Sequence, residues 1–309
     1  MPDASGPRPR LVIVAGPTGS GKSALAARLA ARIGGAVINA DSLALYRGLD
    51  IGTAKPGPEE TALAPHHLVS VLDPSEPCDA ARYSSMARPL VAGLWAGGVP
   101  PVACGGTGLY LRTLAKGLFE GPPASPALRG AFSGMERDGI GLHSVLEALD
   151  PETASRLNPR DRVRVERALE VVLQTGSSMA GLQDSHALSD RPFDVLALVL
   201  EVETEELDRR IGARTDMMFE AGLVEEVRGL LARGYSPDLK PLMSIGYREA
   251  VMHIRGELTL GEARELVRLN TRRLAKRQRT WFRGQLPEGR RIPPDLDAAL
   301  REAEPFLAS

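Results

Sequence analysis

The chain has 309 residues, enough for one large or two smaller domains, and its 43% hydrophobic and 25% charged residues are ordinary for a soluble globular protein. It contains no run of about 18 apolar residues, which excludes a transmembrane helix, and residues 1–10 lack the apolar core of a signal peptide and are expected to be a short disordered lead-in. A formal net charge of −1 gives no whole-chain sign of a nucleic-acid partner. Cys78 and Cys104 lack the spacing of metal ligands, so we expect buried reduced thiols in a cytoplasmic protein without a membrane anchor.

Short apolar runs alternate with helical patterns in the first third of the chain. Strands are predicted at residues 11–15, 36–40, 68–72 and 99–104, helices at 22–33 and 80–96, and a further strand at 194–202. This alternation predicts an α/β fold, a P-loop NTPase-like parallel sheet flanked by helices on both faces.

The alternation stops at Gly121-Pro122-Pro123 and resumes near Arg191-Pro192. The chain therefore divides into an α/β core at residues 11–120, a helical insertion domain at 121–191, and a return to the core with a helical C-terminal region at 192–285. Within the insertion, residues 161–173 form the clearest helical pattern. Residues 286–309 are rich in proline and glycine at their start and are predicted to be a tail.

The segment between the first predicted strand and helix matches the phosphate-binding motif G-x-x-x-x-G-K-[ST] in full. Its glycines let backbone N–H groups converge on phosphate oxygens at a helix N-terminus. Lys22 is expected to reach the terminal phosphate and Ser23 to hold Mg²⁺. The motif predicts a phosphate ligand without identifying it, and the predicted contacts are Gly16, Thr18, Gly19, Ser20, Gly21, Lys22 and Ser23.

Two aspartates follow predicted strands at the sheet edge where ligands bind in open α/β folds. Asp41 ends the second strand and Asp73 the third. Either carboxylate could accept a proton or contact a metal ion, and Asp41 could equally cap a helix. The local sequence does not decide between them.

A third junction of the same kind follows the fourth predicted strand, at Gly105-Gly106-Thr107-Gly108. The glycines permit a ligand to approach the backbone closely. Thr107 offers a hydroxyl at the start of a helix, although the local sequence by itself favours a capping role in a tight turn.

Basic residues gather near the C-terminus, where only Glu265 opposes eight of them between residues 264 and 283. Arg264, Arg268, Arg272 and Lys276 recur every four residues and so predict one charged stripe on a helix. Such a stripe either contacts an anionic partner or is a solvated face.

These motifs together resemble the tRNA dimethylallyltransferase family of bacterial type. The resemblance rests on the phosphate loop, on Asp41-Ser42, and on the run from Asp50 to Pro56 (DIGTAKP). It continues through residues 105–110 (GGTGLY), Ser244-Ile245-Gly246-Tyr247-Arg248 and residues 270–278 (NTRRLAKRQ). It covers about residues 11–283.

The resemblance implies transfer of a dimethylallyl group from its diphosphate to N6 of the adenosine immediately 3′ of the anticodon. It implies Asp41 as general base, Thr107 as a second catalytic residue that positions the base, Arg214 as a diphosphate contact, Mg²⁺ as cofactor, and a monomer. The insertion would close on the anticodon stem-loop. The implied tRNA contacts are Asp41, Ser42, Leu43, Ala44, Arg164, Arg167, Ser244, Gly246, Tyr247, Arg248, Arg272, Lys276, Arg277 and Gln278.

Two positions depart from the family pattern: Val163 stands where glutamine is usual, and Ala44 where a polar residue is frequent. Three other functions share part of the motif set. A small-molecule or nucleotide kinase would use the P-loop to bind ATP. A non-catalytic RNA-binding protein would not need Lys22, Ser23, Asp41 and Thr107 together. A prenyltransferase for free adenine nucleotides would not need the basic helix.

Overall fold

The computed structural model describes residues 8–117, 121–187 and 191–309. The chain forms two compact units: unit 1 consists of Met1–Ala115 and Pro192–Ser309, and unit 2 of Lys116–Arg191. Unit 2 contains the predicted insertion at residues 121–191. Most of the predicted lead-in lies outside the described residues, and Arg10 already belongs to the first strand.

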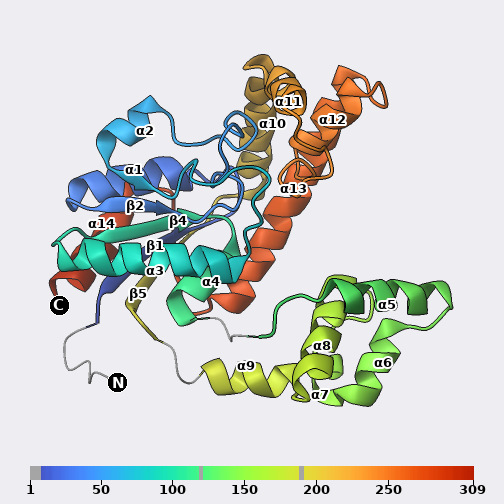
Figure 1. Ribbon diagram of the computed structural model, residues 1–309. Helices are drawn as coiled ribbons and strands as arrows, with labels where there is room; N and C mark the ends of the chain where they lie inside the picture. Colours follow the sequence, from blue (N-terminus) through green and yellow to red (C-terminus); the bar gives the residue numbers. More distant parts are fainter. Residues whose placement is uncertain (1–7, 118–120, 188–190) are drawn as a thin grey trace. The chain divides into compact units, whose positions relative to one another are not determined.

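Unit 1 is built on a parallel sheet of six strands in the order β3-β2-β4-β1-β5-β6 (Figure 1). The central strand β1 pairs with β4 on one side and with β5 on the other, so Val12 lies between Val102 and Leu196. The predicted parallel α/β sheet is therefore confirmed. The strands are β1 (Arg10–Ala15), β2 (Ala36–Asn39), β3 (His66–His67), β4 (Pro101–Gly105), β5 (Asp194–Leu200) and β6 (Arg290–Ile292).

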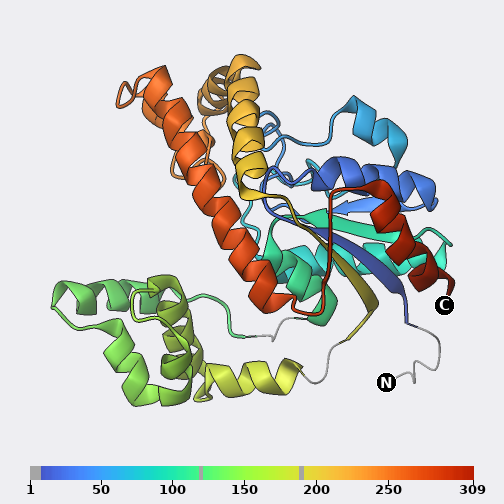
Figure 2. The ribbon, with the colours of Figure 1, turned by 180° about the vertical axis from the view of Figure 1, so that it is seen from behind.

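Helices cover both faces of the sheet (Figures 1 and 2). Successive β1 side chains point to opposite faces: Leu11 and Ile13 join one apolar core, while Val12 and Val14 join the other. The first core is closed by α3 (Ala80–Ala96) and α4 (Gly108–Lys116), and the second by α1 (Lys22–Arg32) and α14 (Leu296–Ala308). The short helix α2 (Pro58–Leu63) packs against α1.

Four further helices of unit 1 lie beyond β5 in the chain. They are α10 (Thr204–Glu220), α11 (Leu223–Ala232), α12 (Tyr247–Ile254) and α13 (Leu260–Gln285). The 26-residue helix α13 packs along α10 and also contacts α12 (Figure 2). Because α10 begins after the end of β5, this group adjoins the carboxyl edge of the sheet, where ligands bind in such folds.

Unit 2 is entirely helical over its described residues and has its own core around Phe132, Leu146 and Leu169. Side-chain caps begin three of its helices, as at Asp161, whose carboxylate accepts from the Arg164 N–H. The helix predicted at residues 161–173 is thus confirmed. The helices are α5 (Pro126–Arg137), α6 (Leu142–Leu149), α7 (Pro151–Arg156), α8 (Arg162–Thr175) and α9 (Met179–Ala187).

The strand predicted at residues 68–72 was wrong. The edge strand β3 is His66–His67, and the apolar run that follows it is irregular. Leu68 and Ser70 both have left-handed backbones, with φ of 59° and 55°, which cannot continue a ladder. Residues 70–72 instead bond to the backbone of residues 44 and 45, so the run packs beneath the loop that follows β2.

The tail predicted at residues 286–309 was also wrong. Strand β6 extends the sheet beyond β5, with Val199 paired to Arg291. Helix α14 begins at an Asp295 cap and buries Ala299, Leu300 and Ala303 in the second core. The prolines at 293 and 294 end the strand and therefore mark a turn inside the domain.

Candidate active site

The phosphate loop connects β1 to α1 at the carboxyl edge of the sheet. Gly19 and Gly21 have φ of 82° and 85°, a left-handed conformation that other residues rarely adopt. Gly21 is the N-cap of α1, so the free N–H groups of the first turn face the loop. The loop is thus shaped to bind an anion through its backbone.

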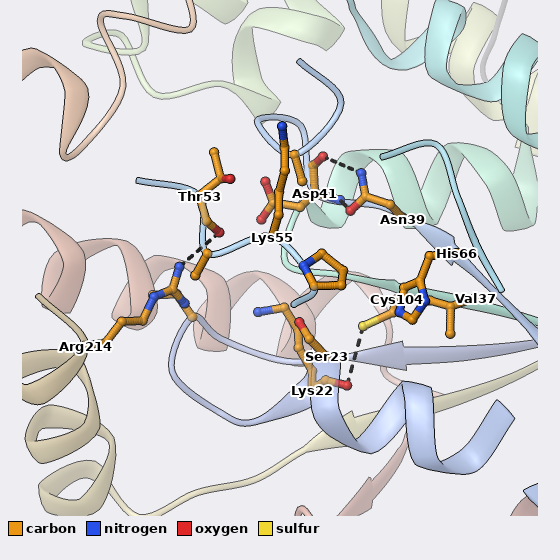
Figure 3. A pocket seen from close by; sticks show the side chains of 15 residues that line it. Lys22, Ser23, Val37, Asn39, Asp41, Thr53, Lys55, His66, Cys104 and Arg214 are labelled. Atoms are coloured by element: carbon orange, nitrogen blue, oxygen red, sulfur yellow. Dashed lines mark hydrogen bonds between the residues drawn. The ribbon is translucent and has the colours of Figure 1, made fainter. Parts of the chain in front are cut away.

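Two cations face the space beside this loop (Figure 3). Lys22 is only 8% exposed, and its ammonium makes one 3.4 Å hydrogen bond to the Pro17 carbonyl. Arg214, from α10, donates to the Thr18 hydroxyl at 3.4 Å and to the Thr53 carbonyl at 3.2 Å. Burial lowers the pKa of both groups, and the Arg214 charge lowers that of Lys22 further. Two partly desolvated cations this close favour an anionic ligand between them.

A cavity of about 380 Å³ opens beside these cations. Its charged lining residues are Lys22, Arg214, Lys240 and Asp41. Its remaining wall is largely apolar and comes from α10, α13 and the loop before α12, with Ile211, Met218, Ile245, Val267 and Leu274. Ile211, Met218 and Val267 belong to no motif of the sequence, because only the packing of α10 against α13 brings them together, whereas Ile245 and Leu274 lie in segments that carry the family resemblance.

Asp41 is held in place by its neighbours. The Asn39 side chain accepts from the Asp41 N–H and donates to the Asp41 carbonyl, both at 3.0 Å. The Asp41 carboxylate accepts from the Leu43 N–H at 2.9 Å, and it attracts the Lys22 ammonium electrostatically. Next to it, the Thr107 hydroxyl accepts from the Ser42 N–H at 3.0 Å. The two predicted catalytic residues therefore meet at the ends of neighbouring strands β2 and β4.

Asp73 is engaged elsewhere. Its carboxylate accepts from the Ser75 N–H and hydroxyl and from the Tyr235 hydroxyl, at 2.9, 2.6 and 2.7 Å. These hydrogen bonds lower the pKa of Asp73 to about 2. Such a carboxylate is a weak base, and it does not line the cavity of Lys22 and Arg214. The geometry therefore favours Asp41 of the two candidates left open by the sequence.

The glycine turn after β4 is close-packed against the protein itself. A Cβ at Gly105 would lie 2.1 Å from the Ala40 carbonyl oxygen, and one at Gly108 would lie 2.3 Å from the Trp281 ring. At Gly106 the nearest atom would be Nε2 of Gln278, 2.6 Å away. These glycines thus give room to the backbone at Ala40 and to helix α13, and Gly105 also lines the small inner cavity beside Lys22.

Gln278, expected among the tRNA contacts, is partly buried, lines the 380 Å³ cavity and bonds to two loops of the protein. Its carbonyl oxygen accepts from the Thr18 N–H at 2.8 Å, and its amide donates to the Gly106 carbonyl at 2.9 Å. It therefore joins the phosphate loop to the turn that carries Thr107.

Two further residues expected to touch tRNA are also buried. Tyr247 is fully buried, and Ala44 is 4% exposed and lines a small inner cavity beneath Lys22. The Ser244-Gly246 segment lines the 380 Å³ cavity together with Ser42 and Leu43, whereas Arg248 is exposed and pairs with the buried Glu249.

The basic stripe predicted on α13 is mostly turned toward α10. Arg268 forms ion pairs with Asp216 and Glu265, and Arg272 lies 3.7 Å from Asp208. Arg264 lies over the Phe219 ring at 5.4 Å. Among the described residues, no ion pair or side-chain hydrogen bond engages the guanidinium or ammonium groups of Arg273, Lys276, Arg277 or Arg283. Of the predicted stripe only Lys276 is thus unpaired within the described part of the chain, and the other unpaired cations of α13 lie outside the stripe.

In unit 2, α8 presents Arg164 and Val163 to solvent. The Arg164 side chain is 67% exposed and lies 3.4 Å from the Asp161 carboxylate, and Val163 is 77% exposed. Arg167 is more confined, because it pairs at 3.5 Å with the fully buried Glu170, which also binds Arg129.

The residues beside the phosphate loop fit a magnesium ion shared with a phosphate ligand. Ser23 and Asp41 line the small inner cavity together with Lys22. Over the described ranges of the chain, no three His, Cys, Asp or Glu side chains converge into a protein-only metal site. Mg²⁺ in phosphate-transfer sites typically takes one or two protein oxygens and fills its other positions with phosphate and water.

The parallel sheet, the phosphate loop with its two buried cations, and the carboxylate beside an apolar cavity define a P-loop α/β enzyme for a phosphate-bearing substrate with an apolar part. No helix within the described residues is long and apolar enough to cross a membrane. Both cysteines are buried free thiols, as expected.

Comparison with known proteins identifies the family. The model of the IPP transferase family matches residues 44–285, and that of isopentenyl transferase matches residues 9–64. The chain is 49% identical to a tRNA dimethylallyltransferase of Geobacter sulfurreducens, covering 92% of each chain. It is 44% identical to tRNA dimethylallyltransferase 2 of Syntrophus aciditrophicus over 97% of each. The chain belongs to the IPP transferase family and is a prenyl-group transferase.

Solved structures agree with this assignment. The full-length tRNA isopentenylpyrophosphate transferase of Bacillus halodurans is 34% identical, with a TM-score of 0.72 over 97% of this chain and 96% of that one. A eukaryotic dimethylallyltransferase acting on tRNA is 26% identical, with a TM-score of 0.80 over 96% of this chain and 77% of the other.

Proposed function

We propose that this enzyme transfers the dimethylallyl group of dimethylallyl diphosphate to N6 of the adenosine immediately 3′ of the anticodon in tRNA. The observation that carries the proposal is one cavity that joins Lys22, Arg214 and Asp41 to an apolar wall. The cations match a diphosphate, the Asp41 carboxylate can accept a proton, and the apolar wall suits a five-carbon hydrocarbon. With tRNA as acceptor, we expect a monomeric enzyme of the cytoplasm.

The diphosphate end of the donor is assigned to the phosphate loop. Loop N–H groups, the Lys22 ammonium and the Arg214 guanidinium would neutralise the charge that develops as the C1–O bond of the donor breaks. Lys22 and Arg214 are partly desolvated, and an anion bound between them offsets part of that cost. The same two groups therefore bind the diphosphate and stabilise it as the leaving group. Ser23 would help to hold a Mg²⁺ ion bound together with the donor, and this ion would supply further charge neutralisation.

The acceptor amine is assigned to the side of Asp41. N6 forms a bond to C1 of the allyl group, the C1–O electron pair leaves with the diphosphate, and the proton of N6 passes to the Asp41 carboxylate. The exocyclic amine of adenine is a poor nucleophile, so a positioned base contributes about 10²–10⁴-fold. Thr107, fixed by the Ser42 N–H, would position the base, which must first leave its stack.

Recognition of the RNA backbone is assigned to the unpaired cations of α13 and to Arg164 on unit 2. Arg273 lies three and four residues before Lys276 and Arg277 and therefore neighbours both on the surface of the helix. Phosphate contacts of this kind position an RNA without reading its sequence.

The test is direct. The protein is incubated with labelled dimethylallyl diphosphate, bulk tRNA and Mg²⁺, and the digested RNA is analysed for prenylated adenosine. We expect label on adenosine and no consumption of ATP. ATP hydrolysis without prenyl transfer would instead identify a kinase, and labelling of free adenine nucleotides in preference to tRNA would identify the smaller acceptor.

A further inference from the structure

The loop between β2 and α2 forms one wall of the donor site. Thr53, Ala54, Lys55 and Pro56 line the inner cavity with Lys22, and Gly52 and Thr53 line the larger one. The Thr53 carbonyl accepts from Arg214, which also donates to Thr18 of the phosphate loop. The position of this loop therefore sets the position of the Arg214 guanidinium (Figure 3).

One carboxylate from a distant helix holds this loop. Glu226 on α11 accepts from three successive backbone N–H groups, those of Asp50 and Ile51 at 3.0 and 2.8 Å and that of Gly52 at 3.4 Å. The buried Tyr247 hydroxyl donates to the same carboxylate at 2.7 Å. Three consecutive N–H groups converging on one anion form a nest, the same device by which a phosphate loop binds phosphate.

The contact between the loop and Tyr247 requires a glycine. A Cβ at Gly52 would lie 2.5 Å from the Tyr247 ring, so only glycine lets the loop reach this depth. On its other side the loop is tied by the Lys55 ammonium, which binds the Asp50 carboxylate at 2.6 Å and the Ser70 hydroxyl at 2.8 Å. The loop is thus pinned at both ends around Thr53.

We propose that Glu226, supported by Tyr247, is a positioning residue for the donor site: it anchors the loop at residues 50–52 and thereby aims Arg214 at the diphosphate. Glu226 lines neither cavity and touches no reacting atom. The inference rests on the proposed function for the identity of the donor. What it predicts directly is how tightly the site binds a diphosphate anion.

The test measures Glu226→Gln against Glu225→Gln. Glu225 lies on the same turn of α11, is exposed, and makes no hydrogen bond or ion pair among the described residues, so it controls for loss of a charge. Inorganic pyrophosphate is the probe, titrated by calorimetry, so that binding is read without catalysis. A carboxylate that accepts several bonds is worth more than one neutral bond, so we expect the pyrophosphate Kd to rise about 10-fold in Glu226→Gln and to stay near wild type in Glu225→Gln.

Turnover adds a second readout. We expect the KM for the donor to rise, with a smaller fall in kcat and a tRNA affinity within about twofold of wild type, because Arg214 is assigned to the diphosphate and to no part of the tRNA. Lower thermal stability with unchanged pyrophosphate affinity would show a merely structural role and overturn the inference.

Two provisions cover a Glu226→Gln variant that does not fold and an enzyme that transfers no prenyl group. If Glu226→Gln does not fold, Tyr247→Phe removes one of the four hydrogen bonds and keeps the ring, and we expect a Kd increase of about two- to fivefold. An unchanged Kd in that variant overturns the inference. If the wild type binds pyrophosphate but transfers no prenyl group, the proposed function fails, while the pyrophosphate comparison still decides the role of Glu226.

Discussion

Replacing the unpaired cations of α13 should weaken tRNA binding in a way that salt reveals. The variant is Lys276→Gln with Arg277→Gln, and the control is Arg264→Gln with Arg268→Gln, two arginines that face α10. Both variants remove two positive charges from the same helix. They differ only in whether those charges are engaged within the protein.

The magnitude follows from counterion release. Each lost phosphate contact flattens the slope of log affinity against log salt by about one unit, so two lost contacts flatten it by about two. Between 50 and 200 mM salt, the wild type should then lose about 16-fold more affinity than the variant does. The control should keep the wild-type slope and unfold at a lower temperature, because it loses the buried contacts of Arg264 and Arg268.

The assay is tRNA binding across a salt series for the three proteins, together with thermal unfolding. Donor affinity should be unchanged by Lys276→Gln with Arg277→Gln. An unchanged salt slope in that variant would refute the reasoning and leave RNA recognition to unit 2. A flattened slope in the control instead would mean that RNA displaces the acidic partners of α10.

The remaining predictions concern the chemical centre and its packing. Asp41→Asn should lower the transfer rate by about 10²-fold or more with donor affinity near normal, while Asp73→Asn should retain the rate, as measured by single-turnover transfer; the reverse pattern would identify Asp73 as the base. Because burial lowers the pKa of Lys22 below 10.5, its charge is lost at lower pH than that of a free lysine. Pyrophosphate affinity should therefore fall as the pH rises through that lowered pKa, and a Lys22→Arg variant should show no such fall. Gly108→Ala places a methyl group 2.3 Å from the Trp281 ring and should cost about 1–3 kcal/mol of unfolding free energy in thermal or denaturant unfolding; unchanged stability would mean that the α13 contact is loose.

The sequence predicted the features that depend on local spacing. The phosphate loop, the Asp41 junction and the glycine turn each follow an apolar run, and parallel strands bring all three to one edge. The structure differs from the predictions where a residue's partners lie far away in the chain. A stripe spaced every four residues cannot show which side meets a partner helix, so the stripe includes Arg268 although Asp216 of α10 pairs with it.

The same limit applies to two residues whose contacts within the protein the sequence does not reveal. Gln278 and Tyr247 belong to motifs with exposed basic neighbours, but Gln278 bonds to Thr18 and Tyr247 to Glu226, and neither partner is a neighbour in the sequence. Glu226 carries no motif at all, because its partners are backbone groups of a loop far away in the chain. The strand β6 was missed because its three residues are too few for a periodic pattern.

The sheet of unit 1 has a consequence for the order of folding during synthesis. Strand β1 pairs with β5 only after the whole of unit 2 has been made, and the last strand to join, β6, lies close to the C-terminus. Unit 2 is one continuous segment with a core of its own. When the ribosome has completed unit 2, this helical unit can fold while the sheet still lacks two of its six strands, and the apolar edge of β1 stays open to chaperones. Pulsed hydrogen exchange should find the amides of α8 protected earlier than those of β1.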